Sequence, residues 1–321
     1  MNRIKKKYKI LITGSSGQIG TNLALKLLSE GYDVFGVDCR ENTWSNKYPT
    51  LLQDLAVIQQ NFKGGIGAAQ YPKCDLVVHL AANAKVHALV QEPHKAMENI
   101  NITFNVLEYC RQNSLPIIFS SSREVYGDIH RYITNEEHAN FSFTESPYSA
   151  SKIAGEALIY SYARCYGTKY IVFRFSNVYG RYDNDLERME RVIPLFIDKM
   201  SNNLEVTVFG KDKILDFTYV DDCVDGIFLG IKKLLSGIVE NETINLAYGE
   251  GTNLIEVAKK IQSNLKSKSK INIEQTKQAG EVTHYIADIS IAKMLLGYKP
   301  STRIDFGIKK AIEWSKDWNG K

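Results

Sequence analysis

The sequence lacks several features that would point to other classes of protein. It has only 5 cysteines in 321 residues; they lie far apart, form no CxxC pair and are odd in number. That pattern argues against a disulfide framework or a structural zinc site. No apolar run reaches the roughly 18 residues needed to cross a membrane, and the N-terminus lacks the apolar core of a signal peptide. We therefore expect a cytoplasmic protein with reduced thiols.

An excess of charge of one sign is also missing. Lys and Arg number 40 against 36 Asp and Glu, so the net charge is only +4. Spread along this length, it predicts binding neither to nucleic acid nor to a membrane surface. Hydrophobic residues make up 44% and charged residues 24%, which is ordinary for a globular protein and excludes a collagen-like or disordered chain. The length favours one large domain or two coupled domains.

Short apolar runs alternate with helical patterns through the first half. Runs that are apolar throughout are typical of strands buried on both faces of a parallel sheet. Strands that alternate with helices predict a doubly wound α/β sheet. We expect these strands at 8–13, 32–37, 74–80, 116–120 and 169–175. The helices between them are expected at 22–29, 96–111 and 149–165. The stretch 39–73 is weakly patterned, so the strand expected there is short or poorly marked.

The second half changes character without a Pro/Gly-rich linker. Its expected strands lie at 204–209, 243–248 and 271–275. Its expected helices lie near 192–200, 221–235, 253–266 and 304–317. We predict a smaller C-terminal α/β region packed on the first domain. Ligands of such sheets bind beyond the carboxyl ends of the strands, so we expect a cleft between the two parts.

A glycine-rich loop follows the first expected strand and opens the first helix; it reads Gly14-Ser-Ser-Gly17-Gln18-Ile19-Gly20. Glycines let the backbone turn tightly and approach a pyrophosphate closely, and the helix N-terminus offers free N–H groups. With a strand before it and a helix after it, the loop predicts dinucleotide binding.

Asp38 ends the second expected strand, 18 positions after Gly20. A carboxylate there accepts hydrogen bonds from both hydroxyls of a ribose and repels a 2′-phosphate, which favours NAD over NADP. Arg40 leaves the alternative open, since a nearby arginine can hold that phosphate.

The spacing Gly-x-x-Gly-x-x-Gly resembles the extended short-chain dehydrogenase/reductases, and the likeness continues along almost the whole chain. It is to their NAD-dependent sugar-nucleotide epimerases and dehydratases, similar to UDP-glucose 4-epimerase. Segment Asp54-Leu55 resembles an adenine contact, and His79-Leu80-Ala81-Ala82 resembles the motif beside the nicotinamide. The resemblance also implies a cofactor role for Asn99, in a segment similar to the family's central helix.

Tyr148 and Lys152 start an expected helix. At positions i and i+4 they share one helix face, so the phenol and the ammonium can converge on one ligand. A free tyrosine, with a pKa near 10, is a poor base at neutral pH. A nearby Lys⁺ and the positive nicotinamide of NAD⁺ favour the phenolate and lower its pKa. We therefore expect Tyr148 to take the proton of a sugar hydroxyl while hydride leaves the same carbon.

The fourth strand ends in Ser120-Ser-Ser122-Arg-Glu124. The resemblance implies that Ser122 hydrogen-bonds the reacting oxygen; a helix N-cap is the structural alternative. Glu124 is ambiguous, because plain 4-epimerases of the family often have a small or hydroxyl residue there. Sugar-nucleotide dehydratases and UDP-glucuronate decarboxylases often have Glu. The neighbouring Arg123, where a dehydratase usually has a second acid, weakens the dehydratase interpretation, and Glu124 can also be merely structural.

The resemblance implies a diphosphate contact for Asn177, within Arg174-Phe-Ser-Asn177. Leu215 stands where the family commonly has a phosphate-binding arginine, and a second customary arginine is also absent. Lys213 and Lys277 are available substitutes, although we expect both at the surface.

We predict a Rossmann-type NAD-binding domain over 1–176 and a mainly substrate-binding region over 177–321, some segments of which return to the first domain. The expected activity is NAD-dependent 4-epimerisation of a nucleoside-diphosphate sugar through a transient 4-keto intermediate. Dehydration or decarboxylation using Glu124 is the alternative, and a non-catalytic nucleotide-binding regulator is a further one. We expect a homodimer through helices near 94–112 and 148–166, the second of which carries surplus apolar residues: Ala154, Ala157, Leu158, Ile159 and Tyr162.

Overall fold

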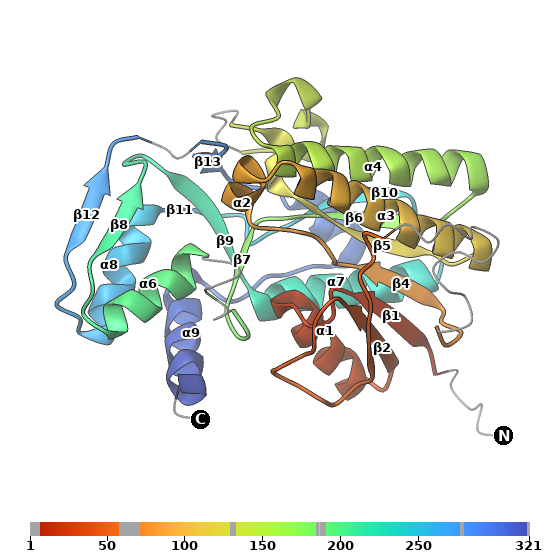
Figure 1. The fold of residues 1–321 in the computed structure, drawn as a ribbon, viewed down its shortest axis with the longest axis horizontal. Coiled ribbons are helices and arrows are strands. Elements are labelled where there is room, and N and C mark those ends of the chain that lie inside the picture. Colours follow the sequence, from red (N-terminus) through yellow and green to blue (C-terminus); the bar gives the residue numbers. More distant parts are fainter. Residues whose placement is uncertain are drawn as a thin grey trace.

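The fold is seen in a computed structural model, which describes residues 7–57, 71–128, 133–183, 186, 191–276 and 279–319. Its main sheet has seven parallel strands in the order β10-β6-β5-β4-β1-β2-β3 (Figure 1). The strands are β1 (Lys9–Thr13), β2 (Asp33–Asp38), β3 (Thr50–Leu52), β4 (Leu76–His79), β5 (Ile117–Ser122), β6 (Tyr170–Phe175) and β10 (Glu242–Leu246). The prediction of a doubly wound, Rossmann-type sheet is confirmed.

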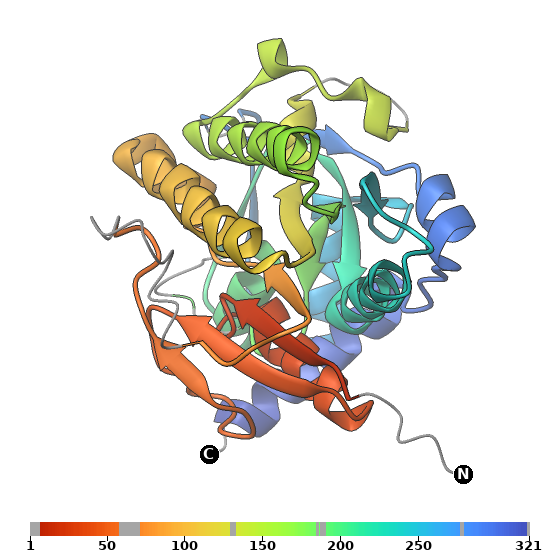
Figure 2. The ribbon, with the colours of Figure 1, turned by 90° about the vertical axis from the view of Figure 1, so that its right-hand side faces the viewer.

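Helices cover both faces of this sheet. Figures 1 and 2 show α3 (His94–Asn113) and α4 (Pro147–Tyr166) on one face, and α1 (Gln18–Ser29) and α7 (Val220–Leu235) on the other. Strand β1 shows why its sequence is apolar throughout. Ile10 packs in the core that contains Leu23 of α1, whereas its neighbour Leu11 packs in the core that contains Val106 of α3. Successive side chains of a strand point to opposite faces, so a doubly covered strand is apolar at every position.

The second half builds a smaller region beside the carboxyl ends of these strands (Figure 1). Strands β11 (Gly251–Asn253), β9 (Ile214–Tyr219), β13 (His284–Tyr285) and β7 (Asn177–Tyr179) form one small sheet, and β8 (Val206–Phe209) pairs with β12 (Ile271–Glu274). Its helices are α6 (Val192–Ser201), α8 (Leu254–Leu265) and α9 (Ile304–Asn319). The described residues also form short elements: α2 (Val86–Gln91), η1 (Arg123–Tyr126), η2 (Glu136–His138), η3 (Phe141–Phe143) and η4 (Ala292–Leu296).

Two segments of the second half return to the main sheet. The strand expected at 243–248 is β10, which pairs in parallel with β6. The helix expected near 221–235 is α7, packed against α1. Strand β3 is the short strand expected within the weakly patterned stretch 39–73.

The parallel strands present their carboxyl ends to the same edge, facing the smaller region. A cleft of about 820 Å³ lies there. Residues that end or immediately follow β1, β2, β4, β5 and β6 all line it, as expected for the binding crevice of a doubly wound sheet.

No cysteine of the five forms a disulfide. Within the described ranges, no helix has both the length and the apolar character that a bilayer-spanning segment requires.

Candidate active site

The glycine loop forms one end of the cleft. Gly14 has a φ of +71°, and a Cβ atom on it would lie 2.7 Å from the backbone nitrogen of Ala81. A Cβ atom on Gly20 would collide with the carbonyl oxygen of Gly14. Both positions therefore require glycine. The resulting tight turn brings the N-terminus of α1 to the cleft, where Gly14, Gly17, Gln18, Ile19 and Gly20 are all lining residues.

Asp38 lies beside this loop at the end of β2, with 7% of its surface exposed. Its Oδ2 accepts a 2.9 Å hydrogen bond from the Ser16 N–H, and its Oδ1 accepts one of 3.2 Å from the Arg40 N–H. These bonds hold the carboxylate in the wall of the cleft. The Arg40 guanidinium lies over the Trp44 ring, 5.5 Å from its centre. Asp38 is thus the acidic group at the point where a ribose is expected.

The next part of the wall comes from the loops that follow β3 and β4. Leu80, Ala81 and Ala82 line the cleft, as do Asp54 and Leu55. These five expected cofactor contacts therefore lie on one surface.

His79 is buried beneath that surface. Its Nδ1 lies 2.7 Å from the Thr13 hydroxyl, and its Nε2 lies 3.3 Å from the Thr103 hydroxyl. Burial lowers the pKa of His79 to about 3, so the ring is neutral and serves to join β1, β4 and α3.

Asn99 is not among the residues that line the cleft. Its Oδ1 accepts a 2.7 Å hydrogen bond from the Asn83 N–H. Its Nδ2 donates to the Asn83 carbonyl at 3.0 Å and to the Ser151 hydroxyl at 3.1 Å. The Ser151 hydroxyl in turn donates to the Tyr148 carbonyl. Asn99 therefore ties the loop after β4 to the first turns of α4, and its expected cofactor role stays a prediction.

Tyr148 and Lys152 both line the cleft, on the first turns of α4. Ser146 caps this helix by accepting a hydrogen bond from the Ser149 N–H, and Pro147 occupies its first position. The Lys152 ammonium donates to the Ser120 carbonyl at 2.7 Å and lies 5.8 Å from the centre of the Tyr148 ring. The two side chains therefore share one helix face and one cleft, as expected for positions i and i+4.

The pKa of the phenol in the protein alone is set mainly by burial. Burial raises the pKa of Tyr148 to about 12, and the negative charge of Glu124 adds to this, while the Ser122 hydroxyl opposes it as a hydrogen-bonding neighbour. Burial also lowers the pKa of Lys152 to about 8. The sequence-based expectation concerns a phenol beside both Lys⁺ and the positive nicotinamide of NAD⁺, and it stays a prediction; in the protein alone, desolvation is the largest influence on the pKa of Tyr148.

The Ser122 hydroxyl caps a short helix and also faces the cleft. It accepts a 3.2 Å hydrogen bond from the Glu124 N–H and so caps η1. It also lines the cleft next to the Tyr148 phenol.

Glu124 lies in the same wall with 4% of its surface exposed. Its Oε1 pairs with Arg123 at 2.9 Å, whereas its Oε2 has no hydrogen-bond partner among the described residues. Burial raises the pKa of Glu124, and the charges of Arg123 and Lys213 oppose that effect. Arg123, where a second acid was considered, is thus the cation that partly neutralises Glu124.

Asn177 lines the cleft on the side of the smaller region. Its Oδ1 accepts a 3.2 Å hydrogen bond from Arg123, and its Nδ2 donates to the Asp216 carbonyl at 2.9 Å. The amide nitrogen carries two N–H groups, so among the described residues one N–H remains available for a diphosphate contact.

The expectation of a surface position for Lys213 is wrong. Only 6% of Lys213 is exposed, and its ammonium pairs with Glu281 at 2.9 Å inside the cleft. It lies one residue before β9 and two positions before Leu215 of that strand, and both residues line the cleft. Lys213 thus brings a cation close to Leu215, where the arginine is absent. Lys277 lies outside the described residues.

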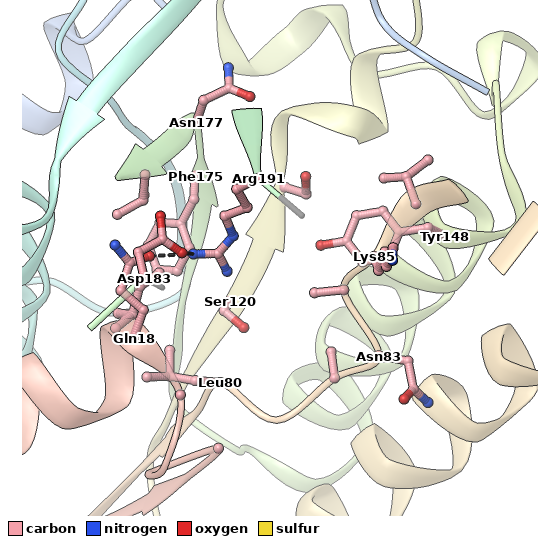
Figure 3. A pocket seen from close by; sticks show the side chains of 18 of the residues that line it. Gln18, Leu80, Asn83, Lys85, Ser120, Tyr148, Phe175, Asn177, Asp183 and Arg191 are labelled. Carbon is pink, nitrogen blue, oxygen red and sulfur yellow. Dashed lines mark hydrogen bonds and ion pairs between the residues drawn. The ribbon is translucent and has the colours of Figure 1, made fainter. Parts of the chain in front are cut away.

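Sequence reasoning missed Arg191 and Asp183. Arg191 precedes α6, and its Nη1 donates to the Asp183 Oδ1 at 2.8 Å and to the Gln18 Oε1. Figure 3 shows this contact, with Tyr148 across the cleft from it. Burial raises the pKa of Asp183 to about 7, and Arg191 opposes that effect. No motif marked either residue, because only the folded chain brings 183 and 191 to the glycine loop.

Comparisons with known proteins agree with this geometry. A profile described as the NAD dependent epimerase/dehydratase family matches residues 10–247. A putative UDP-glucose 4-epimerase of Methanocaldococcus jannaschii is 30% identical, over 97% of this chain and 99% of that protein.

Solved structures give the same picture. The UDP-glucose 4-epimerase of Thermotoga maritima, determined with UDP-glucose, has a TM-score of 0.87 and 28% identity, covering 97% of this chain and 99% of that one. The UDP-glucuronic acid 4-epimerase of Bacillus cereus, determined with UDP-glucuronic acid and NAD, has a TM-score of 0.83 and 25% identity with the same coverage. The resemblance inferred from the motifs is confirmed: the chain belongs to the NAD-dependent epimerase/dehydratase family.

Proposed function

We propose that this protein is an NAD-dependent nucleoside-diphosphate-sugar 4-epimerase. The observation that carries the proposal is the position of Tyr148 and Lys152. Both lie in one cleft, between a glycine loop shaped for a dinucleotide and a wall supplied by the smaller region. An acid–base pair at that junction can reach a sugar carbon and a cofactor at the same time.

The residues present fit NAD. Gly14 and Gly20 leave no room for a Cβ atom, so the loop backbone stays open to a pyrophosphate. Asp38 offers carboxylate oxygens to a ribose and repels a 2′-phosphate. Arg40, the residue that favoured the NADP alternative, lies over the Trp44 ring. Bound beside these residues, NAD would supply reversible hydride acceptance at C4 of the sugar.

The chain's own residues move the proton. The Tyr148 oxygen takes the proton of the C4 hydroxyl as a general base and gives it back as a general acid. A pKa of about 12 makes the buried phenol a reluctant base in the protein alone. The positive charge of the oxidised nicotinamide supplies the opposing effect. The Ser122 hydroxyl, beside the phenol, steadies the charge that develops on the sugar oxygen.

We assign the two parts of the chain different ligands. Residues 1–176 hold NAD, and residues 177–321 mainly bind the sugar nucleotide, although β10 and α7 of that range belong to the main sheet. Lys213 and Asn177 are the groups available to its diphosphate, because both line the substrate side of the cleft. The charge of Lys213 replaces that of the arginine absent at position 215.

Glu124 supports dehydration as a second candidate activity. A carboxylate beside Tyr148, with one oxygen unpartnered among the described residues, has the position required to remove a proton next to a 4-keto group. That would make the protein a dehydratase. We favour epimerisation because Arg123 occupies the place of the second acid and pairs with Glu124.

The experiment is to incubate the purified protein with UDP-, GDP-, CDP- and dTDP-sugars and to analyse each product by mass spectrometry and NMR. We expect a product of unchanged mass with inverted configuration at C4. Loss of water identifies a dehydratase, and loss of carbon dioxide identifies a decarboxylase. Tightly bound NAD without turnover of any sugar nucleotide identifies a regulator.

We also propose a cytoplasmic homodimer that pairs α3 and α4 of each subunit. On α4, Ala157 is exposed and Leu158 is half-buried, while Met97 on α3 is 58% exposed. Ile159 and Tyr162, counted as surplus from the sequence, are instead buried in the subunit's own core. A symmetric interface would bury the remaining apolar surface. Light scattering should give twice the 36.3 kDa of one chain; a single-chain mass at micromolar concentration would contradict this.

A further inference from the structure

We propose that Arg191, which belongs to the smaller region, binds the pyrophosphate of the dinucleotide at the glycine loop. The inference rests on the proposed function for the presence of NAD. It adds a residue that lies far from the glycine motif in sequence and reaches it only in the folded chain.

The position of Arg191 is set by two contacts. Its Nη1 donates to Oδ1 of Asp183 at 2.8 Å and to Oε1 of Gln18. Gln18 is the first residue of α1 and belongs to the glycine loop. The guanidinium therefore stands at the start of α1, in the cleft where the pyrophosphate of a dinucleotide is expected. About a third of its side chain remains exposed, which leaves it accessible to a ligand.

The surroundings of Arg191 call for an anion. The first turn of the 12-residue helix α1 has no acidic residue, and Gly17 has no side chain to cap it. Its N-terminal N–H groups thus present a partial positive charge that the helix itself leaves uncompensated. Gln18 is 5% exposed and lines the cleft, and its Nε2 finds no acceptor within the described ranges. The Asp183 carboxylate neutralises the Arg191 guanidinium, but it leaves the partial positive charge at the N-terminus of α1 without a counter-charge. A group with two negative charges would satisfy these donors together.

Asp183 acts as a positioning residue for Arg191. It is 6% exposed and lies in the same loop segment as Tyr182, whose ring packs 5.6 Å from that of Trp44. In that segment the Arg181 carbonyl accepts a hydrogen bond of 3.2 Å from Asn22 of α1. These contacts fix the segment beside the start of α1. The Asp183 carboxylate is therefore held in place, and it positions the Arg191 guanidinium.

The consequence concerns cofactor retention. If a ligand of the pyrophosphate comes from the smaller region, the contact of Arg191 must also break before NAD leaves, which slows its release. An enzyme that regenerates its cofactor in every turnover gains from such retention.

The test is calorimetric titration of the full-length protein with NAD and, separately, with UDP. The variants are Arg191→Ala, which removes the charge, and Arg191→Lys, which keeps it without the planar fork. We expect Arg191→Ala to weaken NAD about 10- to 100-fold, the worth of a lost charge-assisted hydrogen bond, and Arg191→Lys to weaken it less. UDP affinity should stay unchanged in both variants. Lys213→Met, which removes another cation of the cleft away from the glycine loop, should leave NAD affinity unchanged.

The outcomes separate the inference from the proposed function. Wild-type protein that binds no NAD would overturn both. Arg191→Ala that binds NAD as tightly as wild type would overturn the inference alone. Weaker UDP with unchanged NAD would assign Arg191 to the sugar nucleotide and also contradict it. Thermal unfolding of each variant shows whether the fold is intact; should Arg191→Ala not fold, the comparison of Arg191→Lys with wild type decides, and equal NAD affinity in the two would contradict the inference.

Discussion

The ammonium of Lys152 lies 5.8 Å from the centre of the Tyr148 ring and is held there by a 2.7 Å hydrogen bond to the Ser120 carbonyl. The bond anchors the lysine to the end of β5, the strand that also supplies Ser122. Three groups of the proposed chemistry are thus fixed by one helix turn and one strand end. Precise placement of this kind is what acid–base catalysis requires.

Tyr148→Phe should lose turnover by about 10²–10⁴-fold, because only the phenolic oxygen transfers the proton. The ring remains, so the fold and NAD binding should be retained. Steady-state kinetics on the active sugar nucleotide, with NAD titration as the control, measure this. Near-normal turnover would remove Tyr148 from the mechanism.

Binding of NAD⁺ should lower the pKa of Tyr148 from its value of about 12 in the protein alone. Burial disfavours the phenolate, and a positive nicotinamide nearby favours it. Alkaline titration followed by phenolate absorbance should therefore show one tyrosine ionising at lower pH with NAD⁺ than without it. Tyr148→Phe should lack that transition. The same shift with NADH, whose ring is neutral, would contradict the electrostatic explanation.

Asp38→Ala should weaken NAD binding. It should also reduce the ratio of the affinity for NAD to the affinity for NADP. Two charge-assisted hydrogen bonds to the ribose are lost, each worth at most about 1.5–3 kcal/mol. Asp38 also accepts from the Ser16 and Arg40 N–H groups, so Asp38→Asn, which retains one acceptor oxygen, is the matched control for loop geometry. Tighter binding of NADP than of NAD by the wild-type protein would show that the role given to Asp38 is wrong.

Glu124→Gln distinguishes the two leading activities. In an epimerase no C5 proton is removed, and the amide keeps the size and most of the hydrogen bonding, so the cost should be small. In a dehydratase the amide cannot take the C5 proton, and single-turnover absorbance would show NADH accumulating while product formation stops. A decarboxylase would show an intermediate loss. We expect the small effect, because Arg123 pairs with Glu124 where a second acid would be needed.

The sequence was informative where function depends on neighbouring residues. The glycine loop, Asp38 and the Tyr148–Lys152 pair each follow from a local pattern, and the structure brings all of them to one cleft. Strands buried on both faces were equally visible, because a short run that is apolar at every position is typical of a strand covered by helices on both sides.

Residues that depend on tertiary packing were not predictable in the same way. In the sequence, Lys213 looks like any surface lysine. Only the fold shows that it lies in the cleft with Glu281 beside its ammonium. Strand β9 itself was missed, since Ile214–Tyr219 carries a buried aspartate, Asp216, whose carboxylate accepts backbone hydrogen bonds. Arg191 reaches Gln18 across 173 positions of sequence. Asn99 was placed on the cofactor, yet its amide is committed to Asn83 and Ser151.

The most direct test of the central claim uses a sugar nucleotide labelled with deuterium at C4. An epimerase that takes hydride from C4 and returns it to the same carbon should give the C4-inverted product, of unchanged mass, with the deuterium still at C4. The label should be retained because hydride carried by the cofactor does not exchange with water. Loss of deuterium to solvent, or a product lighter by water or carbon dioxide, would contradict the account.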